Sequence, residues 1–493
     1  MQHFSEDRIS RVTWLAILFV VVLSPALNPV WSNPLPSGNK KIDIESLEEV
    51  AKQRSDHLIA IEKNIAALKS EIRARDLELS PTLNTQFNQS VNHKATTSSL
   101  PNGDKRYFDL ALEQNFSTGT AARLSVRHNW QDSTQQGVSN EVEWDVRLAQ
   151  SLWRNSLGRA VRLRQSRDAA EWQAQLLNGE HQRQTFLVDL EGGYWELVLA
   201  RKEQEIGKEN LKRSESLLSW IRDRVRRSAA EVADLLQIEA LVLERQLQLT
   251  EVESRIQATL KKLQNLIPGY ALDVTAIDEA SLEFDGQTSK RLTPSALAVG
   301  YPASAPIRWD ALAAHWTAQK LQDEAQRIDD LQKPILDFYV SYGQNGIHNN
   351  LSEAWDRATG RQYSETQIGL SFITQLDAPL KEEQRLSARL KSEGQALSAA
   401  ALKRDSQTDW AELVRNLDNL KKQRDMALQL AQLQVRKSLE ERKRYQMGRS
   451  TAFQAISFES EAATAQLRKY RIMAEIKKLE ARVRLFTFEG EGR

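Results

Sequence analysis

Two stretches of this chain, each about 65 to 70 residues long, have a helical charge pattern and contain no proline. They run from about Arg159 to Arg227 and from about Leu380 to Met447. Because an α-helix rises 1.5 Å per residue, each stretch predicts a helix of roughly 100 Å. A globular domain of this size does not need helices of that length.

A shorter helical pattern of about 37 residues follows each long one, from Glu231 to Ile267 and from Thr451 to Phe488. Gly448 separates the second pair, and glycine readily adopts the positive φ that lets a chain reverse. In the first pair, Ser228 aligns with Gly448. The sequence therefore predicts two helical hairpins, and the alternative is a kinked helix without reversal. The predicted tips contain Arg227, Ser228, Ala229 and Ala230 in one hairpin and Met447, Gly448, Arg449 and Ser450 in the other.

Two further helical patterns end at prolines that precede alternating segments. An apolar seam runs from Leu58 to Leu79 before Pro81, and a second pattern runs from Pro306 to Leu331 before Pro334. After each proline the apolar period changes from about 3.6 to 2 residues, which indicates strands. We expect four strands in the first half and two in the second, joined by loops in polar tracts such as residues 343–360.

The order of helix, strands, long helix and shorter helix thus occurs twice, which predicts a duplicated chain. The predicted repeats span residues 33–268 and 306–493, with a segment rich in serine, proline and glycine between them at 269–305. Apolar alternation fits both the half-buried sheet of a soluble domain and a membrane β-barrel. Periodicity alone favours the soluble sheet, because the barrel signal of each strand is weak.

Residues 1–32 have the features of a secretory signal peptide. Arg8 and Arg11 precede the apolar run Val12 to Leu23, which is short for a membrane span. We expect an exported chain that begins near Asn33, with an uncleaved anchor as the alternative. The chain contains no cysteine, which excludes disulfides, thiolate metal sites and a lipid attached to an N-terminal cysteine.

Composition and motifs argue against nucleic-acid binding and catalysis. The 67 Lys and Arg residues are interspersed with 66 Asp and Glu residues, so no basic face is predicted. The seven histidines have no metal-binding spacing, and neither a phosphate-binding glycine loop nor a Gly-x-Ser-x-Gly elbow occurs. Acidic pairs such as Glu440 and Glu441 lie on charged helical faces that predict solvated surface. We therefore expect no enzyme activity, no cofactor, no metal and no nucleic-acid partner.

The order of these elements, the two tips and two segments resemble the TolC-type outer-membrane efflux family. The segments are AQSLWRNSLGRA, from Ala149 to Ala160, and EGGYWELVLARKEQE, from Glu191 to Glu205. In many members the junction from strand to helix reads Gln-Pro-Leu-Leu-Arg-Gly. Gln150, Leu152 and Arg154 match this pattern, whereas its proline and glycine are absent here.

The resemblance implies an α+β membrane protein: a homotrimer whose β-barrel continues into a long periplasmic α-helical barrel. In the family each chain gives four strands to a twelve-stranded barrel. The residues agree with self-association, because one chain has too few strands to close a barrel and an open edge cannot face lipid. The six strand-like segments depart from the family's four, and the extra hairpin, from about Tyr107 to Trp130, either extends the barrel or decorates it.

By the same resemblance the protein would be a passive exit duct in the bacterial outer membrane, in contact with outer-membrane lipid. An inner-membrane transporter would deliver substrates, for efflux or type I secretion, through a periplasmic adaptor that meets the hairpin tips. Residues 269–305 would belt the middle of the helical tube, and a plain linker is the alternative. The alternative function is a structural periplasmic coiled-coil protein with a soluble β-domain and no pore.

The resemblance also raises the question of a charged gate at the tips. Some family members carry two aspartates three residues apart after the second tip, at the positions of Gln454 and Ser457 here. This chain lacks that acidic ring, but Glu231 and Asp234 follow the first tip and would be repeated three times in a trimer. We expect a weak cation preference through Asp234. The alternative is that Asp234 only caps or solvates the start of a helix.

Overall fold

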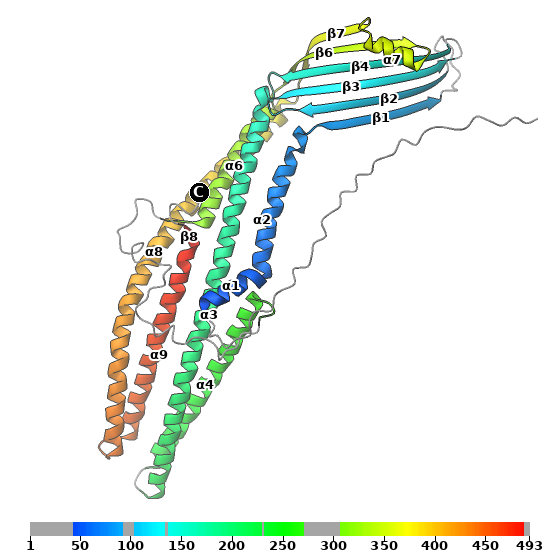
Figure 1. Ribbon diagram of the computed structural model, residues 1–493. Helices are drawn as coiled ribbons and strands as arrows, with labels where there is room; N and C mark the ends of the chain where they lie inside the picture. Colours follow the sequence, from blue (N-terminus) through cyan, green and yellow to red (C-terminus); the bar gives the residue numbers. More distant parts are fainter. Residues whose placement is uncertain (1–42, 92–102, 134–136, 229–230, 271–305, 488–493) are drawn as a thin grey trace, which may run out of the picture. The chain divides into compact units, whose positions relative to one another are not determined.

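The computed structural model describes residues 43–91, 103–133, 137–228, 231–270 and 306–487 (Figure 1). The predicted signal peptide and nearly all of the predicted segment between the halves lie outside these residues. Among the described helices, none combines the length and the apolar character needed to cross a membrane.

Two very long helices are the longest elements of the described chain. Helix α3 (Arg159–Arg226) has 68 residues and α8 (Ala378–Gln446) has 69, as the proline-free stretches predicted. A shorter helix packs back along each of them, α4 (Val232–Leu266) along α3 and α9 (Ala452–Arg482) along α8. The two predicted hairpins are therefore confirmed, and the alternative of a helix without reversal is wrong.

Three shorter helices pack on α3, and they are α1 (Ile44–Arg54), α2 (Asp56–Arg75) and α6 (Trp309–Leu331). Two helices end earlier than predicted. The seam before Pro81 is α-helical only to Arg75, because the chain tightens into a 3₁₀ turn at Asp76–Leu79. Similarly, α9 ends at Arg482, and β8 (Phe486–Thr487) leaves the helix to pair with β5 (Ile307–Arg308).

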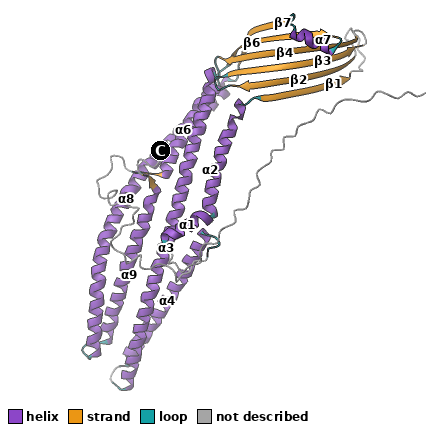
Figure 2. Ribbon diagram, viewed as in Figure 1, coloured by secondary structure: helices purple, strands orange, loops and turns teal. Residues whose placement is uncertain are grey.

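Six strands form one antiparallel sheet (Figure 2) in the order β1-β2-β3-β4-β6-β7. Four of them come from the first half and two from the second, as predicted. The hairpin of β2 and β3 lies inside the sheet between β1 and β4, so it does not decorate an edge. The strands are β1 (Thr82–Val91), β2 (Gly103–Asn115), β3 (Thr120–Ser133), β4 (Gly137–Ser151), β6 (Ile335–His348) and β7 (Ser364–Ile373).

Residues 343–360 are not the loop that their polarity predicted. Strand β6 continues to His348, and helix α7 (Leu351–Thr359) follows, with Asn350 as its N-cap. The many polar residues hid a helical pattern. Its apolar residues recur three or four positions apart, at Leu351, Ala354, Trp355 and Ala358.

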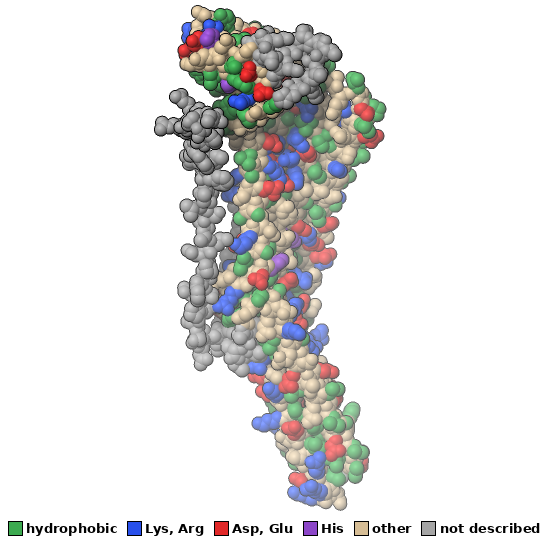
Figure 3. All heavy atoms as spheres, turned by 90° about the vertical axis from the view of Figure 1, so that its right-hand side faces the viewer, with side chains coloured by type: hydrophobic (Ala, Val, Ile, Leu, Met, Phe, Trp, Pro, Cys, Tyr) green, Lys and Arg blue, Asp and Glu red, His purple; other side chains and the backbone are tan. Residues whose placement is uncertain are grey.

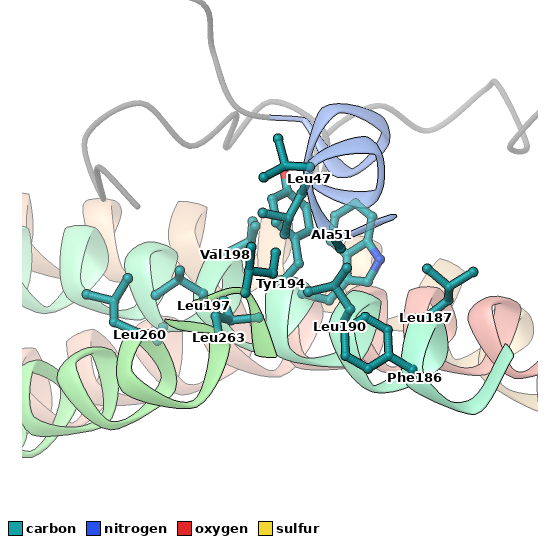
Figure 4. Packing of buried hydrophobic residues seen from close by; sticks show 14 of the residues in the cluster. Leu47, Ala51, Phe186, Leu187, Leu190, Tyr194, Leu197, Val198, Leu260 and Leu263 are labelled. Atoms are coloured by element: carbon teal, nitrogen blue, oxygen red, sulfur yellow. The ribbon is translucent and has the colours of Figure 1, made fainter. Parts of the chain in front are cut away.

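The largest buried cluster holds α1 and α4 against the middle of α3 (Figure 4). Leu190 of α3, Leu47 of α1 and Leu263 of α4 are completely buried there. Replacing one such leucine with alanine typically costs about 2 to 5 kcal/mol. This cluster therefore fixes the end of α4 that lies away from the tip of its hairpin.

Candidate functional site

The first tip turns at Ser228, as the alignment with Gly448 predicted. Helix α3 ends at Arg226, Arg227 is its C-cap, and Ser228 has a φ of +56°. Ala229 and Ala230 lie outside the described residues. Glu231 is the N-cap of α4, but its side chain accepts no capping hydrogen bond, and Asp234 stands in the first turn. Asp234 is therefore not the N-cap, but it does stand at the start of the helix, where the alternative also places it.

The second tip turns at Gly448, which has a φ of +73°. Met447 is the C-cap of α8, and the N–H group of Arg449 donates to the carbonyl of Arg444 at 2.8 Å. Apart from the glycine and its two chain neighbours, no atom lies within 4 Å of the place where a side chain on Gly448 would begin. The tip is thus a tight turn whose outer side is open.

Polar residues brace the start of α9 beside this turn. Thr451 is the N-cap, and its hydroxyl accepts a hydrogen bond from Gln454 N at 3.3 Å. The Ser450 hydroxyl bonds both to the Gln454 side chain, at 3.0 Å, and to the carboxylate of Glu441. Gln454 is exposed and Ser457 is half-buried. No acidic side chain takes their places, so this tip has no acidic pair.

Ionic contacts join the first hairpin to helix α9 of the second. Arg213 Nε of α3 lies 3.0 Å from Glu459 Oε1. The buried carboxylate of Glu203 lies 2.5 Å from Arg255 Nη1 of α4 and 2.8 Å from Arg471 Nε of α9. These contacts span three helices. They therefore hold the two hairpins together within one chain.

Nearer the tips, the Trp220 and Tyr445 rings meet edge to face with centroids 4.8 Å apart. Burial raises the pKa of the Tyr445 hydroxyl, and the negative charge of Asp234 raises it further. Asp234 is half-buried and acts on the side chain of α8 rather than standing free in solvent. The predicted gate residue thus lies at the contact between the two hairpins.

The sheet has two faces of opposite character, because directly paired residues in neighbouring strands point to the same side. We call the first the apolar sheet face; exposed hydrophobic side chains continue across all six strands on it. We call the second the polar sheet face. The apolar sheet face contains Leu83, Phe87, Phe108, Leu112, Leu124, Val146, Leu148, Phe338, Tyr342, Ile368, Leu370 and Phe372. The polar sheet face contains Asn88, Asp109, Glu113, Arg123, Arg127, Glu143, Asp145, Arg147, Asp337 and Gln367.

Ion pairs run across the polar sheet face from strand to strand. Arg127 Nε lies 3.3 Å from Asp109 Oδ1 of β2, and its Nη1 lies 3.0 Å from Glu143 Oε2 of β4. Arg123 Nη1 lies 3.1 Å from Glu113 Oε1. Charged groups of this kind need water or one another, so this face cannot meet a hydrocarbon phase.

The junction from β4 to α3 shows what the matched residues do. The Gln150 amide accepts from the Thr120 hydroxyl at 2.6 Å and donates to the Thr118 carbonyl at 3.2 Å, which fixes the β2–β3 turn. The backbone N–H group of Leu152 donates to Leu336 O at 2.8 Å, and that of Arg154 donates to Pro334 O at 3.2 Å. Pro334, one of the two predicted prolines, therefore accepts a backbone hydrogen bond from the junction.

Sequence reasoning missed the residues that make this turn without the family's proline and glycine. Asn155, Leu157 and Gly158 all have positive φ, at 58°, 49° and 75°. A Cβ on Gly158 would lie 1.7 Å from Ser117 O, so only glycine fits there. The Asn155 backbone N–H also donates to Asp330 Oδ2 at 2.9 Å. The asparagine and glycine were visible in the sequence, but their partners were not.

An ion-pair cluster ties α2, α3 and α6 together beside the sheet. Arg75 Nη1 lies 2.6 Å from Asp168 Oδ1 and 2.8 Å from Glu171 Oε2, and Lys320 Nζ lies 2.7 Å from Glu171 Oε1. Burial alone would raise the pKa of Glu171, but the hydrogen bonds from Lys320 and Arg75 lower it. Glu171 therefore stays ionised at neutral pH and holds both cations.

No group of side chains with the composition of a metal site occurs within the described ranges. The prediction that the protein has no catalytic site rests on the absence of motifs in the sequence. The residues that the structure brings together are instead the two tips, the junction and the two faces of the sheet.

No protein-family model matches this sequence, and no curated protein matches it significantly. Solved structures do match it. The outer-membrane protein VceC of Vibrio cholerae is 15% identical, with a TM-score of 0.65 over 90% of this chain and 95% of that chain. The outer-membrane channel OprN is 12% identical, with a TM-score of 0.66 over 90% of this chain and 89% of that one.

The CmeC outer-membrane channel of Campylobacter jejuni is 13% identical, with a TM-score of 0.62 over 95% of this chain and 96% of that chain. The match thus extends over nearly the whole of each protein. At such low identity the similarity concerns the fold. This chain has the fold of TolC-type outer-membrane channels.

Proposed function

We propose that the protein is the outer-membrane channel of a tripartite efflux or type I secretion system, a passive duct for substrates delivered by an inner-membrane transporter and a periplasmic adaptor. The observation that carries this proposal is the sheet, which has one apolar face, one charged face and two open edges. A sheet that crosses lipid must turn an apolar face outward and pair all its backbone groups, and a closed barrel does both. The polar sheet face would then line a water-filled pore.

Several copies of the chain are needed to close this barrel. Strands β1 and β7 are its unpaired edges, with ten residues each, and both are largely exposed. Because the sheet has an even number of strands, β7 of one copy meets β1 of the next in the antiparallel sense. In the trimer expected of this family, three sheets of six strands would form a barrel of eighteen.

The helices also carry surfaces that suit neighbouring copies. On α4, Val232, Leu236, Leu243 and Leu247 are all more than half exposed and recur four or seven residues apart. On α8, Leu386, Leu390 and Leu397 form a similar stripe. Figure 3 shows exposed hydrophobic side chains among charged ones along the helices. In a tube of helices from three chains these stripes would be buried between copies.

The alternative function, a structural coiled-coil protein with a soluble β-domain, is less consistent with the sheet. A soluble domain would cover its apolar sheet face with helices or a second sheet. Among the described elements only the short helix α7 lies on that face. Most of its exposed leucine and phenylalanine side chains would thus be left in water, which favours lipid as their environment.

The decisive experiment is to locate and reconstitute the full-length protein. We expect it in the outer-membrane fraction, as a trimer in mild detergent, and as a source of stepwise conductance in planar lipid bilayers. A monomer in the soluble periplasmic fraction that gives no conductance steps would establish the structural alternative instead.

Asp234 gives a prediction about ion selectivity. Three copies of its carboxylate near the end of the duct would attract cations, and salt would weaken the effect. We expect Asp234→Asn to shift the reversal potential of single channels in a salt gradient toward zero. Glu353→Gln, in α7 at the opposite end of the chain's long helices, is the matched control and should leave it unchanged. If Asp234→Asn channels keep the wild-type reversal potential, the charge that selects ions lies elsewhere.

A further inference from the structure

Helix α7 lies on the apolar sheet face, at the end of the sheet away from the long helices (Figure 1). Val142 of β4 is buried beneath Ala354 and Ala358, which have no exposed surface. Trp144 Nε1 donates a hydrogen bond to Ala358 O at 2.9 Å. A Cβ on Gly346 of β6 would lie 2.1 Å from Ala354 O, so the helix backbone rests directly on the strand.

The apolar stripe of α7 is wider than its contact with the sheet. At about 100° per residue, Ala354, Ala358, Leu351 and Trp355 occupy one continuous stripe. The two alanines at one edge of the stripe touch the sheet, whereas Leu351 is 48% and Trp355 is 47% exposed at the other. Two of the four apolar side chains of this helix are therefore about half exposed in the single chain.

The opposite side of α7 is polar and attached to the end of the sheet. Glu353 Oε2 lies 2.9 Å from His348 Nε2, and Arg357 Nη1 donates to Ile347 O at 3.0 Å. The Asn350 side chain accepts from Ser352 N at 3.0 Å and fixes where the helix starts. The helix thus presents charge toward the sheet end and apolar side chains along the sheet.

We propose that α7 is an interfacial helix that binds the outer leaflet of the membrane through Leu351 and Trp355. This proposal rests on the proposed function, in which the apolar sheet face is the outside of a barrel. A helix with a polar and an apolar side settles at the boundary of headgroups and acyl chains, where tryptophan is also favoured. Three such helices would set the depth of a barrel whose chain has no cysteine for a lipid anchor.

Lipid fits this surface better than a neighbouring copy does. Helix α7 contacts β4 and β6, which are inner strands of the sheet, whereas a second copy would join at β1 or β7. The exposed stripe lies beside Ala354 and Ala358, which rest on the apolar sheet face. Its occupant is therefore the phase that covers that face.

Because the chain has no cysteine, single cysteines can report the environment of each side of α7. The full-length trimer with Trp355→Cys or Asp356→Cys would carry an environment-sensitive fluorophore in phosphatidylethanolamine and phosphatidylglycerol vesicles. Nitroxide-labelled phospholipids with shallow or deep spin labels would quench it. We expect shallow labels to quench position 355 severalfold more than position 356, and deep labels to quench neither.

A third variant, Val146→Cys in the middle of the apolar sheet face, separates this inference from the proposed function. If lipid quenches position 146 but not position 355, the barrel is in the membrane and α7 does not bind lipid. If position 355 is shielded from water but not quenched, a neighbouring protein surface covers it, which also overturns the proposal. If position 146 is not quenched at all, the proposed function fails as well.

Discussion

Cysteines at Asn88 and Gln367 are expected to form disulfides between copies of the chain and convert most of the protein to covalent trimers. Asn88 lies on edge strand β1 and Gln367 on edge strand β7. The native chain has no cysteine, so every disulfide in the variant reports this contact. Oxidation followed by a non-reducing denaturing gel measures the result.

Three features of the edges fix this register. Each edge has ten residues, and aligning them end to end places Thr82 opposite Ile373. The same register pairs Leu83 with Phe372 and Phe87 with Ile368, so residues of the apolar sheet face meet one another. It also continues the apolar band of one copy into the next without a step. A shift by one residue would place apolar side chains against polar ones.

The backbone pattern makes Asn88 and Gln367 a suitable pair for a disulfide. The hydrogen bond from Phe116 N to Thr120 O shows that the backbone groups of even-numbered β2 residues point to β3, so those of odd-numbered β2 residues point to β1. Even-numbered residues of β1 stand opposite these odd-numbered residues and therefore bond to β2. The hydrogen bond from Asn345 N to Tyr363 O shows that the backbone groups of odd-numbered β7 residues point to β6. Both residues therefore bond within their own chain, and across the new edge they would form the narrow type of pair, whose side chains are closer.

Two controls test the register rather than mere proximity. Asn88→Cys with Ile368→Cys places the thiols on opposite faces of the sheet, and Asn88→Cys with Glu365→Cys shifts the register by two residues. Neither should form more than a small fraction of the covalent trimer. A disulfide within one chain between Thr85→Cys and Trp144→Cys would contradict the proposal. In that case β1 would pair with β4, and β2 and β3 would lie outside a twelve-stranded barrel.

The number of strands also sets the width of the barrel. Barrel diameter rises roughly in proportion to strand number, so eighteen strands would give a barrel about one and a half times as wide as twelve.

The sequence predicted those parts of the fold that local patterns control. The absence of proline and the reversal at Gly448 placed the long helices to within a few residues. The number of strands in each half followed from alternation. Partners distant in sequence were not predictable: Asn140 lies opposite His348, and Gly158 fits against Ser117. Helix α7 was missed because two of its four apolar residues are alanines, which contribute little to a hydrophobic pattern, and because polar residues surround them.

The positions of the two tip turns were predictable, but the contacts around them were not. Ser228, Gly448 and Asp234 were found from the hairpin pattern, and their turns agree with it. The effect of the Asp234 charge on the pKa of the Tyr445 hydroxyl depends on how two hairpins pack, which no local pattern encodes. The same holds for the buried Glu203 and its ion pairs with Arg255 and Arg471, which come from two other helices.

Gly448→Trp is expected to abolish transport while leaving the trimer intact. Beyond the two chain neighbours, no atom lies within 4 Å of the site of the new Cβ, so the indole can point outward without a clash within the chain. The positive φ of 73° would cost about 1 to 2 kcal/mol, which a large protein tolerates. If an adaptor docks on this tip, the indole occupies the space that the adaptor needs and blocks docking. Survival in toxic compounds, compared with a strain lacking the gene, measures transport, and mild-detergent electrophoresis measures the trimer.

Gly137→Trp is the matched control, because Gly137 also has a positive φ, of 69°, and open space around its Cβ position. It is the first residue of β4, at the end of the sheet away from the long helices (Figure 1). The same backbone strain and the same added side chain therefore act at a place where no adaptor is expected. Loss of transport in Gly448→Trp but not in Gly137→Trp would assign the effect to the tip. Wild-type transport in both variants would remove the second tip from the docking surface, and loss in both would trace the effect to backbone strain.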